Sequence, residues 1–188
     1  MKALVIACGL MGSGKSSVAR ALAEVLAADV VSSDVVRKEL TDVDLDEHRY
    51  VAFDKGIYSG DTTRLVYEHM CERATTWLQS GQPIVLDACF GKRWQRDLAR
   101  TTALQHGAPF LCVEVTCPLS ELKRRLASRE ADGTDVSDGR LEIFEEHRRK
   151  FEAIEELAAP EHLVVDGRDP PKENARSVLV DLRKRTSR

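Results

Sequence analysis

The sequence predicts a three-layer α/β/α sandwich with a five-stranded, mostly parallel sheet. Short apolar runs recur along the chain and are typical of buried strands, at residues 3–8, 29–32, 83–88, 109–115 and 162–166. Segments with helical apolar spacing lie between these runs. Because strands that alternate with helices favour a parallel sheet covered on both faces, we expect one domain over residues 1–188.

The overall composition argues against several classes of protein. Hydrophobic residues make up 43% of the chain and charged residues 31%, which is typical of a globular domain. No stretch approaches the apolar length of a membrane span, so we expect no membrane partner. The net charge is −3, so no overall field attracts nucleic acid, although a local basic groove stays open as an alternative. The five cysteines are odd in number and lack C-x-x-C spacing, which favours reduced thiols in a cytoplasmic protein.

The helices are predicted from apolar stripes and stop signals. In residues 61–80 an apolar stripe repeats at helical spacing, and Gly81 follows as a stop signal. Further helices are expected at 16–26, 92–106, 118–130, 138–158 and 171–185. Two polar segments, 41–60 and 130–139, are expected to be mobile loops. The second would hinge a small helical lid over residues 118–150.

A glycine-rich loop follows the first predicted strand. Residues 9–16 read Gly-Leu-Met-Gly-Ser-Gly-Lys-Ser and fit the pattern G-x-x-x-x-G-K-[ST] between a strand and a helix. The glycines let the loop turn its N–H groups around a polyphosphate, and the positive end of the helix dipole adds to the attraction. The motif therefore predicts a P-loop NTPase fold that binds ATP. The residues expected to hold the nucleotide here are Gly9, Gly12, Ser13, Gly14, Lys15, Ser16 and Ser17.

Two side chains of the loop and one distant carboxylate are expected to meet at the phosphates. Lys15 would reach the β- and γ-phosphates, and the Ser16 hydroxyl would ligate Mg²⁺. Asp87 ends the apolar run at 83–88, where a carboxylate can hold Mg²⁺ through water. Capping of the next turn by Asp87 is the alternative. Only the fold can bring Asp87 to Lys15, because they are far apart in the chain.

An acidic and a basic residue follow the second predicted strand. Ligands gather at the carboxyl ends of strands in a doubly wound sheet, so Asp34 would face the glycine-rich loop. A carboxylate there can accept the proton of an attacking hydroxyl, and Arg37, one helical turn later, can hold an anionic group of the acceptor. A GTPase or motor ATPase needs a residue that positions water instead. Helix capping by Ser33 or Asp34 is the alternative interpretation.

Basic residues gather in the second half of the chain. Arg125 and Arg129 are four residues apart and so share one helical face, from which they can neutralise charge on a transferring phosphoryl group. A solvated face paired with glutamates is the alternative. The cluster at 147–150 is expected to be salt-bridged helix surface. Trp94 is expected to pack against other side chains, with stacking on a base or sugar as the alternative.

These motifs together resemble those of the small P-loop kinases, which include polynucleotide 5′-hydroxyl kinases, gluconate kinase and zeta-toxin-like kinases. More narrowly, the chain resembles predicted bacterial ATP-binding kinase domains in residues 33–40, in Tyr58, Thr62 and Tyr67, and in residues 135–138. Such domains often follow an aminoglycoside-phosphotransferase-like domain in one chain. The resemblance runs from Lys2 to about Val180.

The resemblance implies a role for each matching residue. Asp34 would be the general base and Arg37 the clamp on an acceptor phosphate, while Lys15, Arg125 and Arg129 would contact the phosphates of ATP. The loop at 166–170, with Arg168, would lie against the adenine. The chain departs from the polynucleotide kinases where it reads Asp-Ala-Cys-Phe at 87–90, since they tend to have a polar residue there. That departure weakens the nucleic-acid interpretation.

The sequence thus predicts an ATP- and Mg²⁺-dependent kinase that transfers the γ-phosphoryl group to a hydroxyl of a small-molecule acceptor. A polynucleotide 5′-hydroxyl kinase is the first alternative. A regulatory or hydrolytic nucleotide-binding module without an acceptor is an alternative of another class. A monomer or a homodimer is expected.

Overall fold

The computed structural model describes residues 1–41, 60–132 and 141–186. Its strands form one sheet in the order β2-β3-β1-β4-β5, and every pairing between neighbours is parallel. The five-stranded parallel sheet predicted from the apolar runs is therefore confirmed. The strands are β1 (Leu4–Cys8), β2 (Asp29–Ser32), β3 (Ile84–Asp87), β4 (Phe110–Thr116) and β5 (His162–Asp166).

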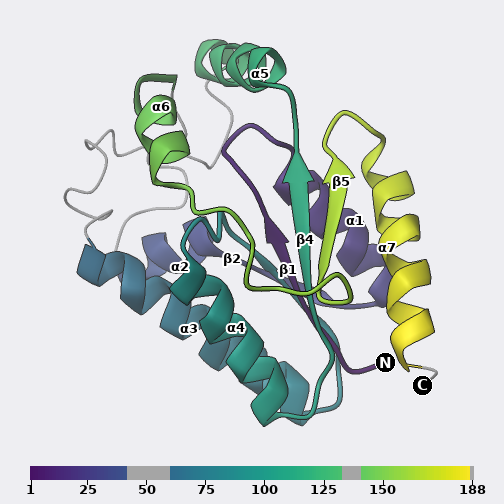
Figure 1. The fold of residues 1–188 in the computed structure, drawn as a ribbon. Helices are drawn as coiled ribbons and strands as arrows, with labels where there is room; N and C mark the ends of the chain where they lie inside the picture. The colour runs from purple at the N-terminus through teal and green to yellow at the C-terminus, as the bar shows by residue number, and fades with distance from the viewer. Residues whose placement is uncertain (42–59, 133–140, 187–188) are drawn as a thin grey trace.

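Helices cover both faces of the sheet and complete the predicted three layers (Figure 1). One face carries α1 and α7, and the other carries α3 and α4, while α5 and α6 lie beyond the carboxyl ends of the strands. The helices are α1 (Lys15–Leu26), α2 (Ser33–Leu40), α3 (Gly60–Gln79), α4 (Arg93–Gln105), α5 (Leu119–Asp132), α6 (Leu141–Lys150) and α7 (Pro171–Thr186).

The sheet separates two hydrophobic clusters, because successive side chains of a strand point to opposite faces. On β1, Leu4 and Ile6 point into the cluster shared with α3 and α4, whereas Val5 and Ala7 point into the cluster shared with α1 and α7. All four are fully buried. A strand that is covered on both faces needs apolar residues at successive positions, which is why unbroken apolar runs marked these strands in the sequence.

The strand register brings the polar ends of three strands to one edge of the sheet. Asp87 is the Cα partner of Ala7 in β1 and of Ser32 in β2. The glycine-rich loop begins two residues after Ala7, and Asp34 follows two residues after Ser32. Residues from three distant parts of the sequence therefore leave the sheet side by side.

The helix predicted at 138–158 is wrong in its second half, because α6 ends at Lys150. The backbone N–H of Glu152 donates to the carbonyl of Gly91 at 2.8 Å, and the carbonyls of Glu152 and Ala153 accept from Arg96. These backbone groups bind another part of the chain, so they cannot continue the helix. The loops expected at 41–60 and 130–139 lie mostly outside the described residues.

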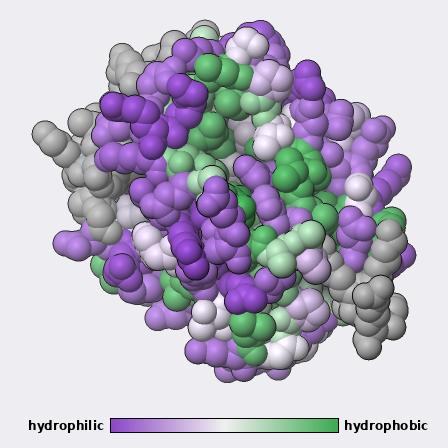
Figure 2. Space-filling model, viewed as in Figure 1, coloured by the Kyte–Doolittle hydropathy of each residue, from purple (hydrophilic) through white to green (hydrophobic). Residues whose placement is uncertain are grey.

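The face of the molecule seen in Figure 2 is mainly hydrophilic, with smaller hydrophobic groups between the polar ones. Most large apolar side chains are buried in the two clusters on either side of the sheet, and a smaller cluster lies between the P-loop, α5 and α6. Within the described ranges, none of the helices combines the length and the apolar character needed to cross a bilayer.

Candidate active site

The glycine-rich loop connects β1 to α1 in left-handed backbone conformations. Gly14 has a φ of 97° and is the N-cap of α1, where no side chain caps the helix. No acidic residue lies in the first turn of α1, so the positive end of this helix keeps its attraction for an anion. The predicted nucleotide-binding residues Gly12, Ser13, Lys15, Ser16 and Ser17 occupy this loop and the first turn of the helix.

Gly9 lies between the residues that follow β3 and the end of β4. Its N–H donates to the carbonyl of Cys89 at 3.2 Å, which ties the loop to the residues after β3. A Cβ at position 9 would lie 2.5 Å from the carbonyl oxygen of Val115, and the φ of Gly9 is 144°. Only glycine fits both the space and the backbone angle here.

Cys89 marks the place where four elements converge. Burial raises the pKa of its thiol, but the charge of Lys15 and the charge and hydrogen bond of His147 lower it more, to about 7. Asp34 acts on the same thiol in the opposite direction. Lys15 of the P-loop, Asp34 of α2 and His147 of α6 are therefore all within electrostatic reach of Cys89. The fold brings together the predicted phosphate lysine and the predicted general base.

Asp87 fits the role of a magnesium ligand. The residue is only 8% exposed, and its buried Oδ1 has no hydrogen-bond partner among the described residues. Mg²⁺ is commonly held by one or two carboxylates, with substrate phosphates and waters completing the shell. Asp87 and the Ser16 hydroxyl would supply protein oxygens of that kind. No group of three or more His, Cys, Asp or Glu side chains suited to a metal occurs in the part of the chain that the structure describes.

Arg37, the predicted clamp on the acceptor, is buried on α2. The residue is 6% exposed, and its Nη1 lies 3.5 Å from the hydroxyl of Thr63 in α3. Its neighbour Lys38 is also buried, at 3%. Arg37 and Lys38 thus place two adjacent cationic side chains of α2 in the interior of the fold.

Arg125 joins α5 to the P-loop through the backbone. Its Nη1 donates to the carbonyls of Gly12 and Ser13 at 3.4 and 3.3 Å, and its Nη2 donates to the carbonyl of Gly167 at 3.0 Å. Its Nε donates to Glu121 at 2.7 Å. Arg125 thus lies against the loop that would hold the phosphates. The side chain of Arg129 is outside the described part of the structure.

Glu121 pairs with Arg124 and Arg125 of its own helix, as the solvated-face interpretation expected of this glutamate. Arg124 and Arg125 lower the pKa of Glu121 to about 2, through hydrogen bonds to its carboxylate. The side chain of Arg124 is 69% exposed, whereas that of Arg125 is 24% exposed. Only Arg125 of this pair reaches the P-loop.

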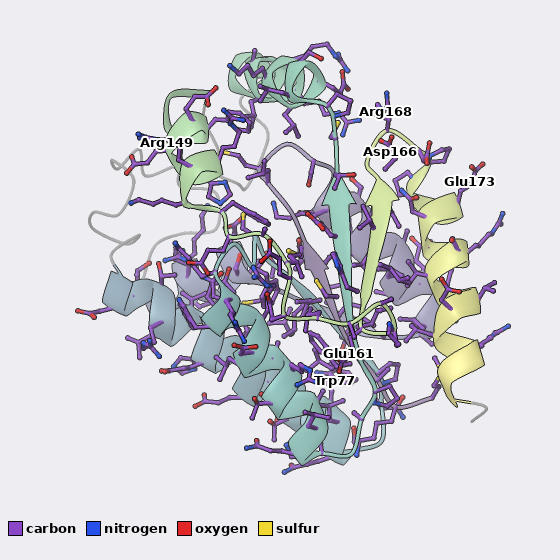
Figure 3. All side chains as sticks on the ribbon, in the orientation of Figure 1. Trp77, Arg149, Glu161, Asp166, Arg168 and Glu173 are labelled. Carbon is purple, nitrogen blue, oxygen red and sulfur yellow. The ribbon has the colours of Figure 1, made fainter. Side chains whose placement is uncertain are left out.

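The loop after β5 closes over the other side of the P-loop. Figure 3 shows Asp166 and Arg168 beside each other at the end of β5, where Arg168 binds the Asp166 carboxylate through Nε and Nη2. This ion pair lowers the pKa of Asp166 to about 2. Between them, Gly167 lies against Ser13, and a Cβ on Gly167 would be 1.8 Å from the Ser13 carbonyl oxygen. Arg168 itself is exposed, at 57%.

Several residues of the site were assigned differently from the sequence. His147 was expected on a salt-bridged surface, and its neighbours do pair there, Arg148 with Glu145 and Lys150 with Glu146. His147 instead reaches Cys89. A histidine within a run of charged residues carries no local signal of this contact, because α6 and β3 are joined only by the tertiary fold.

Trp94 packs against other side chains, as expected from the sequence. Its ring meets Tyr67 edge-on with centroids 5.5 Å apart, and the guanidinium of Arg64 lies 4.8 Å from its centroid. Trp77 is partly buried against the same core cluster. Neither tryptophan is part of the site described above.

Comparison with known proteins fits this geometry. Residues 4–154 match the AAA_33 family, described as AAA domain. The chain belongs to this family. The match includes the P-loop, Asp34, Asp87, Arg125 and His147, and so spans the whole convergence of elements around Cys89.

Curated relatives of this AAA domain are longer proteins. Uncharacterized protein Rv2004c of Mycobacterium tuberculosis is 28% identical over 134 residues, which are 71% of this chain and 27% of the relative. Uncharacterized protein Mb2027c of Mycobacterium bovis matches with the same values. The match to this chain thus spans about a quarter of the length of these relatives.

Solved structures share the fold of this AAA domain at low sequence identity. A sugar kinase from Janibacter sp. HTCC2649 has a TM-score of 0.72 at 17% identity, with 97% of this chain and 95% of that chain covered. A gluconokinase from Sinorhizobium meliloti has a TM-score of 0.66 at 22% identity, covering 97% and 91%. The Mycobacterium tuberculosis APS kinase CysC, solved with AMPPNP and APS, has a TM-score of 0.64 at 23% identity, covering 96% and 97%. The P-loop α/β fold predicted from the sequence is therefore confirmed.

Proposed function

We propose that this AAA domain is an ATP- and Mg²⁺-dependent kinase that phosphorylates a hydroxyl of a small molecule. The observation that carries the proposal is the strand register, which sets Asp87 between Ala7 and Ser32, so that the P-loop and Asp34 leave the sheet side by side. A phosphate-binding lysine and a carboxylate at one edge of the sheet are the two groups that phosphoryl transfer to a hydroxyl needs. The fold shared with a sugar kinase and a gluconokinase supports the same conclusion.

Each residue has a stated part in this reaction. The P-loop amides and Lys15 would bind the phosphates, and Asp34 would accept the proton of the attacking hydroxyl. Mg²⁺, held by Ser16 and Asp87, would neutralise charge on the phosphates. Arg125, which already lies on the P-loop, would need only to exchange its carbonyl partners for phosphate oxygens. Arg129 on the same helix is proposed for the same task.

The acceptor side favours a small molecule with an anionic group. Arg37 lies on α2 one helical turn after Asp34, where its guanidinium would meet an anionic group of the acceptor. Trp94, the side chain best suited to stack on a nucleobase, is occupied by Tyr67 and Arg64. We therefore favour a compact anionic acceptor over a polynucleotide.

The proposal is tested by a screen for ATP consumption and product formation. The panel contains sugars, sugar acids, nucleosides, aminoglycosides and a 5′-hydroxyl oligonucleotide. A phosphorylated small molecule is the expected result. Phosphorylation of the oligonucleotide alone would favour the polynucleotide 5′-hydroxyl kinase instead. Loss of ATP without any phosphorylated product would identify a hydrolytic module and refute the proposal.

Replacing the general base tests the mechanism directly. Asp34→Ala is expected to leave the calorimetric affinity for MgATP within about twofold and to reduce transfer by about 10²-fold or more, the usual scale for a lost general base. Glu39→Gln is the matched control, because Glu39 lies on the same helix and pairs with Arg73 at the surface. Full transfer by Asp34→Ala would show that the base is assigned wrongly.

A further inference from the structure

Arg96 is a buried cation with an unusually complete set of partners. Its side chain is 0% exposed. Nη1 donates to the carbonyls of Phe90 and Glu152 at 2.9 and 3.3 Å, and Nη2 donates to the carbonyl of Ala153 at 3.2 Å. Nη2 and Nε also bind the two carboxylate oxygens of Glu156, which is 5% exposed. One guanidinium thus connects two segments that are about sixty residues apart in the sequence.

The first segment is the turn after β3, residues 88–91. Phe90 is fully buried and has a φ of 46°, a left-handed conformation that costs a non-glycine residue about 1–2 kcal/mol. The turn holds this conformation because Phe90 is fixed from both sides. Its N–H donates to the hydroxyl of Tyr67 at 3.2 Å, and its carbonyl accepts from Arg96. Cys89 is the preceding residue, so the same turn sets where its thiol points.

The second segment is the arm, residues 151–156, which directly follows α6. Besides its bond to Gly91, Glu152 accepts from the backbone N–H of Arg93 at 2.7 Å and from Lys92 at 3.0 Å. The Phe151 ring lies on Gly91, where an added Cβ would be 3.1 Å away. The arm therefore lies along the turn and the start of α4, and the hydrogen bonds of Arg96 hold it there.

The arm continues backward into α6, which carries His147 to the site. The rings of His147 and Phe151 meet edge-on, with centroids 6.5 Å apart. His147 is also near enough to Cys89 to lower the pKa of its thiol. The turn that carries Cys89 and the helix that carries His147 are therefore joined through Arg96 and the arm.

We propose that Arg96 is a positioning residue of the transfer site, because it joins the turn that carries Cys89 to the arm that carries α6. Arg96 touches neither His147 nor the P-loop, and it acts through the turn and the arm. The kinetic part of this inference rests on the proposed kinase function, whereas the structural part does not.

A neighbouring ion pair separates positioning from simple stabilisation. Arg100 lies one turn later on α4, and its Nε binds both carboxylate oxygens of Glu161 at 3.0 Å. This pair also joins α4 to the segment before β5. Among the described residues, Arg100 has no hydrogen bond to the turn at 88–91, and its side chain is 40% exposed. Arg100→Lys is therefore the matched control for Arg96→Lys, in which an ammonium replaces the planar fork and cannot serve all the acceptors.

The test observes His147 in the full-length chain by proton NMR at fixed pH. The chain has five histidines, and the C2 proton of His147 is assigned with a His147→Gln variant. Arg96→Lys is expected to shift the His147 resonance and to leave those of His69 and His106 in place. Arg100→Lys is expected to move none of them. A role in stability alone would lower the thermal midpoint without moving His147, and that result would overturn the proposal.

A second variant keeps the test decisive if Arg96→Lys does not fold. Glu156→Gln keeps the guanidinium and its bond to Phe90 but weakens its hold on the arm. It is expected to shift the His147 resonance as well, and an unchanged resonance in this folded variant would count against the proposal.

The kinetic consequence is a split between rate and binding. With an acceptor from the screen, Arg96→Lys is expected to lower kcat by about 10- to 100-fold, the scale for a misplaced reacting group, and to change the KM for MgATP by less than about twofold. An increase in the KM for MgATP with an unchanged kcat would contradict a positioning role for Arg96. If the wild-type chain transfers phosphate to nothing, the kinase proposal fails, and the NMR result still decides the role of Arg96.

Discussion

Replacing Gly167 with alanine is expected to separate the loop after β5 from the P-loop. The added Cβ would lie 1.8 Å from the carbonyl oxygen of Ser13 and 3.0 Å from a side-chain carbon of Val115. The two backbones must move apart by about 1.6 Å for the shorter contact to reach an ordinary 3.4 Å. Both partners in the shorter contact are main chain, so no rotamer change can absorb the clash.

The cost of this movement is worked from the contacts that it breaks. Overpacking of a closely packed site costs about 1–3 kcal/mol. The movement also strains the bond from the Gly167 N–H to the Thr116 carbonyl, at 2.7 Å, and that from Arg125 to the Gly167 carbonyl, at 3.0 Å. A total of about 3 kcal/mol would lower the thermal midpoint of a chain of this size by about 10 °C.

The assay combines thermal denaturation with calorimetric titration of MgATP. If the loop lies against the adenine, as proposed from the sequence, Gly167→Ala also weakens MgATP binding by about tenfold. Gly81→Ala is the matched control, because Gly81 has a φ of 77° and nothing within 4 Å of an added Cβ. This control carries only backbone strain, of about 1 kcal/mol, and should bind MgATP normally. A wild-type midpoint and affinity in Gly167→Ala would refute the close packing of the two loops.

Two further outcomes follow from particular residues. The thiolate is the reactive form of cysteine, so alkylation of Cys89 followed by mass spectrometry should rise with pH around a midpoint of about 7, and His147→Gln should move that midpoint upward. Cys117 is the internal reference, because burial raises the pKa of its thiol, and equal midpoints for the two thiols would contradict the assignment. Ala27 caps α1 at a φ of 50° on an exposed site, so Ala27→Gly should raise the free energy of unfolding by about 1 kcal/mol in denaturant titration. A loss of stability would show that the strain lies elsewhere.

The inner strands were predictable from the sequence because β1, β3 and most of β4 are buried on both faces and so appear as unbroken apolar runs. The edge strands β2 and β5 are only partly buried, but their short apolar runs also became strands. The P-loop and Asp87 were predictable for a related reason. A motif tied to a strand end inherits its position from the sheet, and the register then places Asp87 between the ends of β1 and β2.

The end of α6 was not predictable because its cause lies far away in the chain. Residues 138–158 have the charge pattern of a solvated helix, and nothing among them signals a stop. The stop comes from Arg96 and Gly91, which take up the backbone groups of residues 152 and 153. In the sequence, Arg96 is simply one more arginine beside Trp94. Its complete burial depends on Glu156, and that pairing exists only after the arm has folded onto α4.

Cys89 shows how a residue type can mislead when its surroundings are unknown. A cysteine in place of a polar residue suggested that the position after Asp87 and Ala88 had lost a polar contact. In the fold, burial raises the pKa of this thiol, but Lys15 and His147 lower it more, to about 7. A side chain that behaves as a small hydrophobe in a core thus becomes a polar group at this edge of the sheet. The polarity of the site at this position is therefore set by the P-loop and α6 together, and His147→Gln should remove it without any change to residue 89.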